Sequence, residues 1–171
     1  MQVAKAGWVA ALALLWGVAL PACAPQDRRP GTWLSGERVE GPIEDWAFAA
    51  EHREILVETR TWYGIPHSVT TTFVALDGTL YVPSVYYGGG QFPDERFWNR
   101  NVVRDPRVRL KIGDRLFERR AALVTDAAER QAVFEAFARK LSFWKDLLEK
   151  PASERPTLIF LRMDPPEPDA R

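Results

Sequence analysis

The sequence has 171 residues and very few of the side chains that build metal sites and disulfide frameworks. It contains one cysteine, Cys23, and two histidines, His52 and His67. A single cysteine excludes an internal disulfide framework, a zinc site made of paired cysteines and a Cys-x-x-Cys redox pair. With two histidines that lie apart in the sequence, a histidine-rich metal centre is not expected.

The sequence also lacks an excess of charge of either sign, because 23 basic residues balance 23 acidic residues. Broad electrostatic capture of nucleic acid requires a basic excess, so no nucleic-acid partner is expected. Neither a Gly-x-Ser-x-Gly elbow nor a His-Glu-x-x-His metal helix is present, which leaves no hydrolase signature. Apolar residues make up 46% and aromatic residues 12% of the sequence, enough for one folded domain with a sizeable core.

The amino-terminal residues have the features of a targeting signal. An uncharged apolar run extends from Ala6 to Leu20, and it is shorter than the roughly 20 residues that cross a membrane as a helix. It ends in Leu20-Pro21-Ala22-Cys23, which resembles the bacterial lipoprotein signal, in which the cysteine is lipidated. A plain signal peptide cut near Ala22 or Ala24 and a short uncut anchor are the alternatives.

This resemblance implies a signal over residues 1–22 and lipidation at Cys23. The protein would then be anchored through lipid to a membrane of the bacterial cell envelope, on its periplasmic or extracytoplasmic face. Residues 23–42 are rich in proline, glycine and charge and predict a flexible tether. The folded domain is expected over residues 43–163, and the proline-rich residues 164–171 predict a disordered tail.

Within the domain, most of the pattern favours strands. Alternation and β-branched residues predict six strands, over residues 55–59, 68–76, 79–82, 108–112, 116–124 and 157–161. The pair Asp77-Gly78 predicts a tight hairpin between the second and third strands. A short helix is expected over residues 94–103, ended by Asp105-Pro106.

A late segment changes to helical spacing. Its apolar residues recur every three or four positions, at Phe134, Phe137, Leu141, Trp144 and Leu148. The pattern predicts a helical insert, with a break near Ser142, whose aromatic face belongs to the core or to a dimer contact. Six short strands with a late helical insert predict a small α+β barrel.

Three stretches carry a resemblance to a known superfamily: residues 64–70, 77–84 and 98–108. Their order and spacing resemble the FMN-binding split β-barrel superfamily, whose type member is pyridoxamine 5′-phosphate oxidase. The resemblance implies an α+β fold, a six-stranded split β-barrel of Greek-key type, with a short helix between strands three and four and a helical insert before the last strand. It also implies FMN as cofactor, with deazaflavin or haem as alternatives, and a homodimer that completes the cofactor site.

The resemblance also implies a set of site residues. The cofactor-binding candidates carried over by position are His67, Ser68, Val69, Thr70, Ser84, Arg96, Trp98 and Asn101. The substrate-binding residues of pyridoxamine phosphate oxidation are not recognisable, because Thr70 and Thr72 stand where the oxidase has basic residues. That activity is therefore not expected, and no catalytic residue is identified.

Each candidate also has an ordinary structural interpretation. Arg96, Arg100 and Arg104 recur every four residues and suit either a phosphate or a solvated helix face. Trp98 suits either stacking on a cofactor ring or the core. Two functions follow: a flavin- or deazaflavin-binding protein, with oxidoreductase as its candidate activity, or a non-catalytic envelope lipoprotein that binds haem, flavin or a protein partner.

Overall fold

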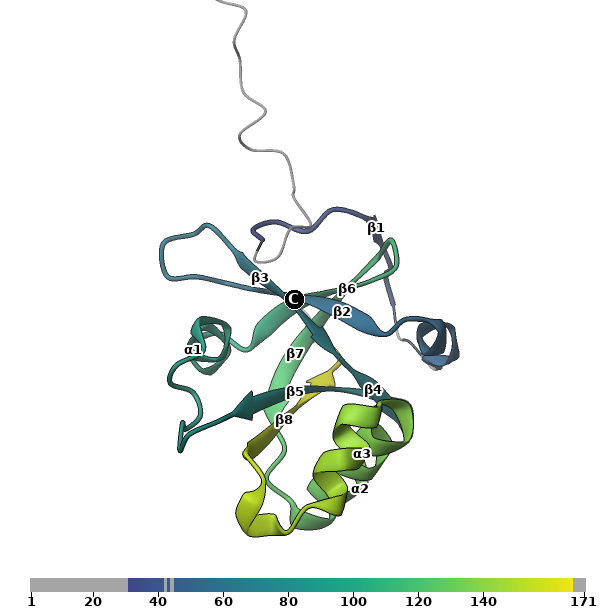
Figure 1. The fold of residues 1–171 in the computed structure, drawn as a ribbon. Coiled ribbons are helices and arrows are strands. Elements are labelled where there is room, and N and C mark those ends of the chain that lie inside the picture. The colour runs from purple at the N-terminus through teal and green to yellow at the C-terminus, as the bar shows by residue number, and fades with distance from the viewer. Residues whose placement is uncertain (1–30, 42, 44, 168–171) are drawn as a thin grey trace, which may run out of the picture.

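A strongly curled sheet forms the centre of the molecule (Figure 1). The computed structural model describes residues 31–41, 43 and 45–167. The predicted signal peptide and Cys23 lie outside these residues. Among the helices of the described ranges, none combines the length and the apolar character needed to cross a membrane.

The sheet has eight strands in the order β3-β2-β6-β7-β8-β5-β4, with β1 attached to β7. All neighbours pair antiparallel except β1 and β7. The strands are β1 (Glu37–Arg38), β2 (Glu54–Thr59), β3 (His67–Thr72), β4 (Val74–Leu76), β5 (Thr79–Tyr86), β6 (Arg107–Ile112), β7 (Arg115–Leu123) and β8 (Thr157–Asp164). The α+β class is therefore confirmed, whereas the count of six strands is wrong.

The additional strands have two origins. The expected strand over residues 68–76 is interrupted at Phe73, whose side chain is buried in the barrel. Its first part, β3, pairs with β2, and its second part, β4, pairs with β5. The other addition, β1, comes from the segment that the sequence predicted to be tether.

That amino-terminal segment lies against the barrel from Gly31 onward. Gly31 forms a backbone bridge with Ser68, and the buried Leu34 donates its N–H to the Glu58 carboxylate at 2.6 Å. Burial raises the pKa of the Glu58 carboxyl, while the bonds from Leu34 and Arg109 oppose that rise. This part of the expected tether is thus in contact with the folded domain.

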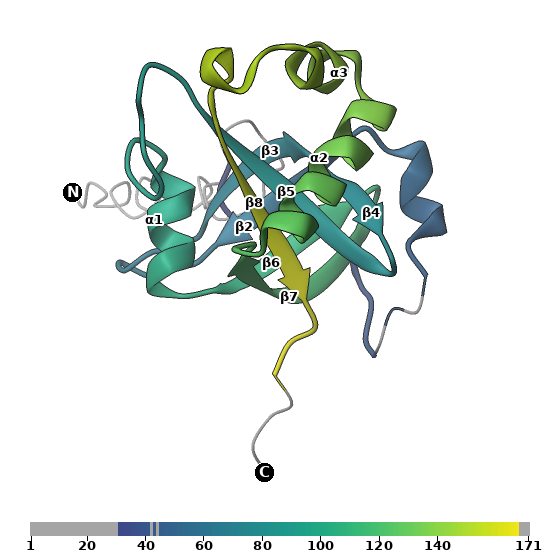
Figure 2. The ribbon, with the colours of Figure 1, turned by 90° about the horizontal axis from the view of Figure 1, so that it is seen from below.

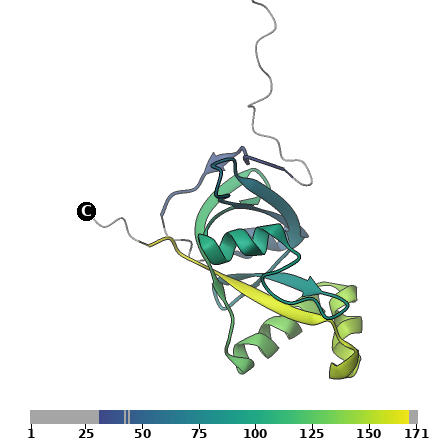
Figure 3. The same ribbon diagram turned by 90° about the vertical axis from the view of Figure 1, so that its left-hand side faces the viewer.

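Five helical segments complete the described part of the fold. They are η1 (Ala47–Glu51), α1 (Phe97–Arg104), α2 (Ala127–Lys140), α3 (Ser142–Glu149) and η2 (Ala152–Glu154). The break near Ser142 is confirmed, because Leu141 is extended between α2 and α3. In Figure 3, α1 lies across the opening of the curled sheet. In Figure 2, which views the molecule from below, α2 lies in front of the sheet.

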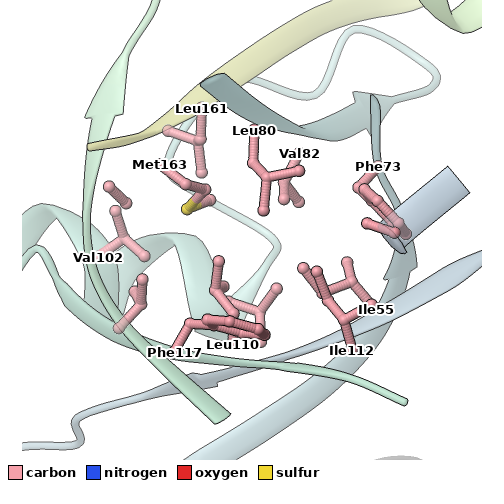
Figure 4. Close-up of a cluster of buried hydrophobic side chains, with 14 of the residues drawn as sticks. Ile55, Phe73, Leu80, Val82, Val102, Leu110, Ile112, Phe117, Leu161 and Met163 are labelled. Atoms are coloured by element: carbon pink, nitrogen blue, oxygen red, sulfur yellow. The ribbon is translucent and has the colours of Figure 1, made fainter. Parts of the chain in front are cut away.

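The buried apolar side chains form two clusters. The first fills the barrel, where residues from opposite strands such as Leu80 and Leu110 point toward one another (Figure 4). The second lies between the sheet and the pair α2 and α3, around Phe134, Phe137, Trp144 and Phe160. The aromatic face of the helical insert therefore packs within this chain's own core.

Phe137 should contribute strongly to the stability of this second cluster. Its side chain is fully buried, with its ring centroid 4.7 Å from that of Trp144 and 5.7 Å from that of Phe160. Because truncation leaves a cavity, Phe137→Ala should lower the free energy of unfolding by about 3–5 kcal/mol. The half-exposed Phe143 is the control, and Phe143→Ala should cost less than about 1 kcal/mol. If denaturant titrations gave the two variants equal losses in the free energy of unfolding, Phe137 would not be the central residue of this cluster.

Candidate functional site

The sheet is open between β3 and β5, which touch without being neighbours in the strand order. A pocket of about 500 Å³ lies at this opening, and we call it the split pocket. It is lined by residues of the strands β2, β3 and β5, of α3 and of the start of α1: Glu54, Val69, Thr70, Thr71, Thr72, Pro83, Ser84, Val85, Arg96, Trp98, Phe143 and Trp144.

The split pocket brings together most of the residues suggested by the sequence. Val69, Thr70, Ser84, Arg96 and Trp98 line it. The segments that carry these residues are separated along the chain, and the fold places them on one hollow. Three other candidates, discussed below, lie outside its lining.

Arg96 supplies the positive charge of the split pocket. Its Nε and Nη2 donate to the Val85 carbonyl oxygen at 3.2 and 2.5 Å, and its guanidinium carbon lies 5.5 Å from the Tyr86 ring centroid. No ion pair to Arg96 is found within the described ranges, and the Glu54 carboxylate is the acidic group of the pocket lining. A guanidinium fixed in this way suits the anionic part of a ligand.

Polar groups on the strands complete this wall. Thr70 Oγ1 is buried, and no described residue provides it with a hydrogen-bond partner. Ser84 Oγ accepts a hydrogen bond from Asn99 Nδ2 at 2.6 Å, and the same amide donates to the Tyr86 hydroxyl. Buried polar groups normally have partners, so an unpartnered hydroxyl in a pocket is a position that a ligand can satisfy.

Asn99 is a functional candidate that the sequence reasoning missed. It is fully buried, and its Oδ1 has no partner in the described part of the chain. Its two donated bonds join α1 to the end of β5. The sequence could have indicated that Asn99 is buried, because it lies three residues before Val102 and so shares the buried side of the helix with it.

Aromatic side chains form the apolar walls. Trp98 is buried in the barrel cluster and also borders the split pocket, so it fits both of its interpretations in part. Phe143 and Trp144 approach from α3 and were not expected here. They reach the pocket because Leu141 ends α2 and turns the chain into a separate helix. Flat aromatic walls suit a planar ring system.

Three predicted residues are not brought into the lining. His67 packs its ring edge-on against Phe97 at 5.1 Å between centroids. Ser68 is fully buried opposite Glu58, beside the amino-terminal segment. Asn101 donates from Nδ2 to Thr59 Oγ1 at 3.0 Å and so joins α1 to β2.

The arginines of α1 do not form one functional face. Arg100 lies with its guanidinium carbon 5.7 Å from the Phe97 ring centroid, and Arg104 donates to the backbone carbonyl oxygen of Arg60. Only Arg96, which precedes the helix, borders the split pocket.

A second hollow, of about 530 Å³, lies between η1 and the end of α2. Lys140 borders it, donates to the Phe73 carbonyl oxygen at 3.1 Å and lies 3.7 Å from the Phe73 ring centroid. Burial lowers the pKa of the Lys140 ammonium. None of the predicted cofactor-binding residues lines this hollow. In the described ranges, no group of three or more His, Cys, Asp or Glu side chains could hold a metal ion.

Residues 54–150 match the family model of the F420H(2)-dependent quinone reductases, and the chain belongs to that family. Every residue that lines the split pocket lies within this span. No curated protein matches the chain.

Two solved structures show the same split-barrel fold at low identity. A candidate pyridoxamine 5′-phosphate oxidase from Listeria innocua has a TM-score of 0.52 and 21% identity, over 70% of this chain and 88% of that one. The haem storage protein HutZ from Vibrio cholerae has a TM-score of 0.50 and 14% identity, over 71% of this chain and 87% of that one.

His67 should titrate below its ordinary range, because burial lowers the pKa of its imidazole from 6.5. The folded protein therefore binds this proton less readily than the unfolded chain does. The folded state therefore has its full stability with respect to His67 above about pH 6.5. This stability is lost as the pH falls through the lowered pKa that His67 has in the folded protein. The proton NMR shift of its ring, assigned with His67→Gln, gives the midpoint directly. A midpoint at or above 6.5 would contradict the burial of the ring.

Proposed function

We propose that this member of the F420H(2)-dependent quinone reductase family is a deazaflavin-dependent reductase that binds F420 in the split pocket. The observation that carries the proposal is the composition of that pocket. A guanidinium that forms no ion pair with a described residue, an unpartnered hydroxyl and aromatic walls, with one carboxylate at Glu54, enclose about 500 Å³ within the span that matches the family. This donor set suits a planar ring with an anionic substituent.

The residues that line the split pocket fit a planar ring with an anionic substituent. We assign the anionic part to Arg96 and a polar contact to the Thr70 hydroxyl. Trp98 and Trp144 would provide apolar surface for the ring and exclude water from it. When bound, a reduced deazaflavin supplies the hydride chemistry. Asn99 acts as a positioning residue, because its amide fixes the Ser84 and Tyr86 hydroxyls.

The family match supports deazaflavin ahead of FMN, which the sequence resemblance placed first. FMN and haem remain the next ligands to test. For the electron acceptor, the family name supports a quinone. The homodimer expected from the resemblance stays a prediction.

Arg96 gives the sharpest test of the cofactor assignment. A charge-assisted contact contributes about 1.5–3 kcal/mol, so Arg96→Ala should weaken F420 binding by roughly 10- to 150-fold. The matched control is Arg104→Ala at the other end of α1, because the Arg104 guanidinium is bound to the Arg60 carbonyl outside the pocket. Arg104→Ala should weaken F420 binding by less than about threefold. Arg96→Lys, which keeps the charge, should recover part of the affinity.

The titrations should be made at one fixed salt concentration, because the contact is electrostatic. Equal affinities in the parent, Arg96→Ala and Arg104→Ala would show that the arginine does not touch the cofactor. The absence of binding by the parent would exclude F420, and the same series would then be made with FMN and haem.

We further propose that the protein is held at the bacterial cell envelope by lipid on Cys23. The support is the sequence Leu20-Pro21-Ala22-Cys23 and the absence of any other cysteine. Cys23→Ser should move the protein from the membrane fraction to the soluble fraction and abolish metabolic labelling with a fatty acid. An unlabelled parent that stays in the membrane fraction would contradict lipidation and favour an uncut anchor.

A further inference from the structure

The hairpin between β2 and β3 presents an unusual group of exposed apolar side chains. Trp62, Tyr63 and Ile65 are 78%, 49% and 47% exposed, and the two aromatic rings meet edge to face at 5.3 Å. We call these three residues the hairpin tip. Exposed aromatic side chains gathered in this way mark an interaction surface.

The hairpin tip is preformed by short-range hydrogen bonds. Thr61 Oγ1 donates to the Ile65 carbonyl oxygen, and the Gly64 N–H donates to the Thr61 carbonyl oxygen. Gly64 has a φ of 85°, a conformation that L side chains rarely adopt. These bonds fix the backbone of the turn from which the two aromatic side chains project.

The charge around the hairpin tip is positive. Neither the hairpin segment 59–67 nor α1 contains an acidic residue. Arg104 of α1 donates to the Arg60 backbone carbonyl, which brings a second arginine to the base of the hairpin. The two acids beside this region, Asp105 and Glu58, form ion pairs with Arg107 and Arg109 and also interact electrostatically with Arg60. Aromatic rings beside arginines suit the interface of an anionic bilayer.

The position of the amino-terminal segment points to the same partner. Gly31 bridges to Ser68 at the base of this hairpin. Figure 1 shows the hairpin at the end of the molecule opposite α2 and α3. Gly31 follows Cys23 by only eight positions along the chain, and eight extended residue steps span at most about 29 Å. A bilayer that holds Cys23 would therefore lie within reach of the hairpin tip.

We propose that Trp62, Tyr63 and Ile65 insert into the headgroup region of the anionic bilayer to which the chain is anchored. The contact fixes the orientation of the barrel on the membrane, with α2 and α3 directed away from it. The inference rests on the envelope location proposed above and not on the bound cofactor. An acceptor dissolved in the bilayer would then meet a barrel held in one orientation.

The test is quenching of tryptophan fluorescence by the bilayer. The lipidated protein, which begins at Cys23, is reconstituted in vesicles of phosphatidylcholine and phosphatidylglycerol, with brominated phosphatidylcholine as the quencher. Trp62→Phe should lose most of the lipid-dependent quenching that the parent shows. The matched control, Trp62→Phe with Leu123→Trp, moves an exposed indole to the last residue of β7 and should not restore quenching. Trp8 and Trp16 belong to the predicted signal and are absent from the lipidated chain, so they do not contribute to the quenching.

Acrylamide, a quencher in water, separates the outcomes. The proposal expects Trp62 to be protected from acrylamide on reconstitution. Unchanged lipid quenching in Trp62→Phe, with Trp62 open to acrylamide, would overturn it and place the hairpin tip in water. Shielding from both quenchers would also overturn it, in favour of a second copy covering the tip. F420 binding by the same variants, measured separately, shows whether the proposed function fails independently.

Discussion

The division of one expected strand at Phe73 determines the rest of this structure. Before the buried Phe73 ring the chain pairs with β2, and after it the chain pairs with β5, at the other end of the strand order. The sheet therefore curls, yet β3 and β5 do not pair and the split pocket lies between them. An unpaired strand edge offers backbone donors and acceptors, so this opening is polar as well as hollow.

Local patterns in the sequence predicted most elements, because burial on one face imposes a period of two or 3.6. The corner at Phe73 was missed, since Phe73 suits a continuous strand as well as a bend. The site was predicted in part. The resemblance indicated consecutive residues from His67 to Thr70, but only Val69 and Thr70 reach the pocket, because Ser68 is covered by the amino-terminal segment and His67 packs against Phe97. Phe143 and Trp144 were missed because only tertiary packing brings α3 to the opening.

The arginines show why sequence spacing alone does not assign function. Arg96, Arg100 and Arg104 share one spacing, but they contact the Val85 carbonyl, the Phe97 ring and the Arg60 carbonyl respectively. The short helix thus has one end at the split pocket and the other at the base of the hairpin. If both proposals hold, α1 links the cofactor to the membrane-facing end of the barrel. Chemistry and orientation would then depend on one eight-residue helix.

The most direct test of the central claim is a crystal structure of the protein with F420. The account predicts the ligand in the split pocket, with its anionic part at Arg96, a polar contact at Thr70 and its ring beside Trp98 or Trp144. Density for F420 in the hollow beside Lys140, or on any surface away from the opening between β3 and β5, would contradict it.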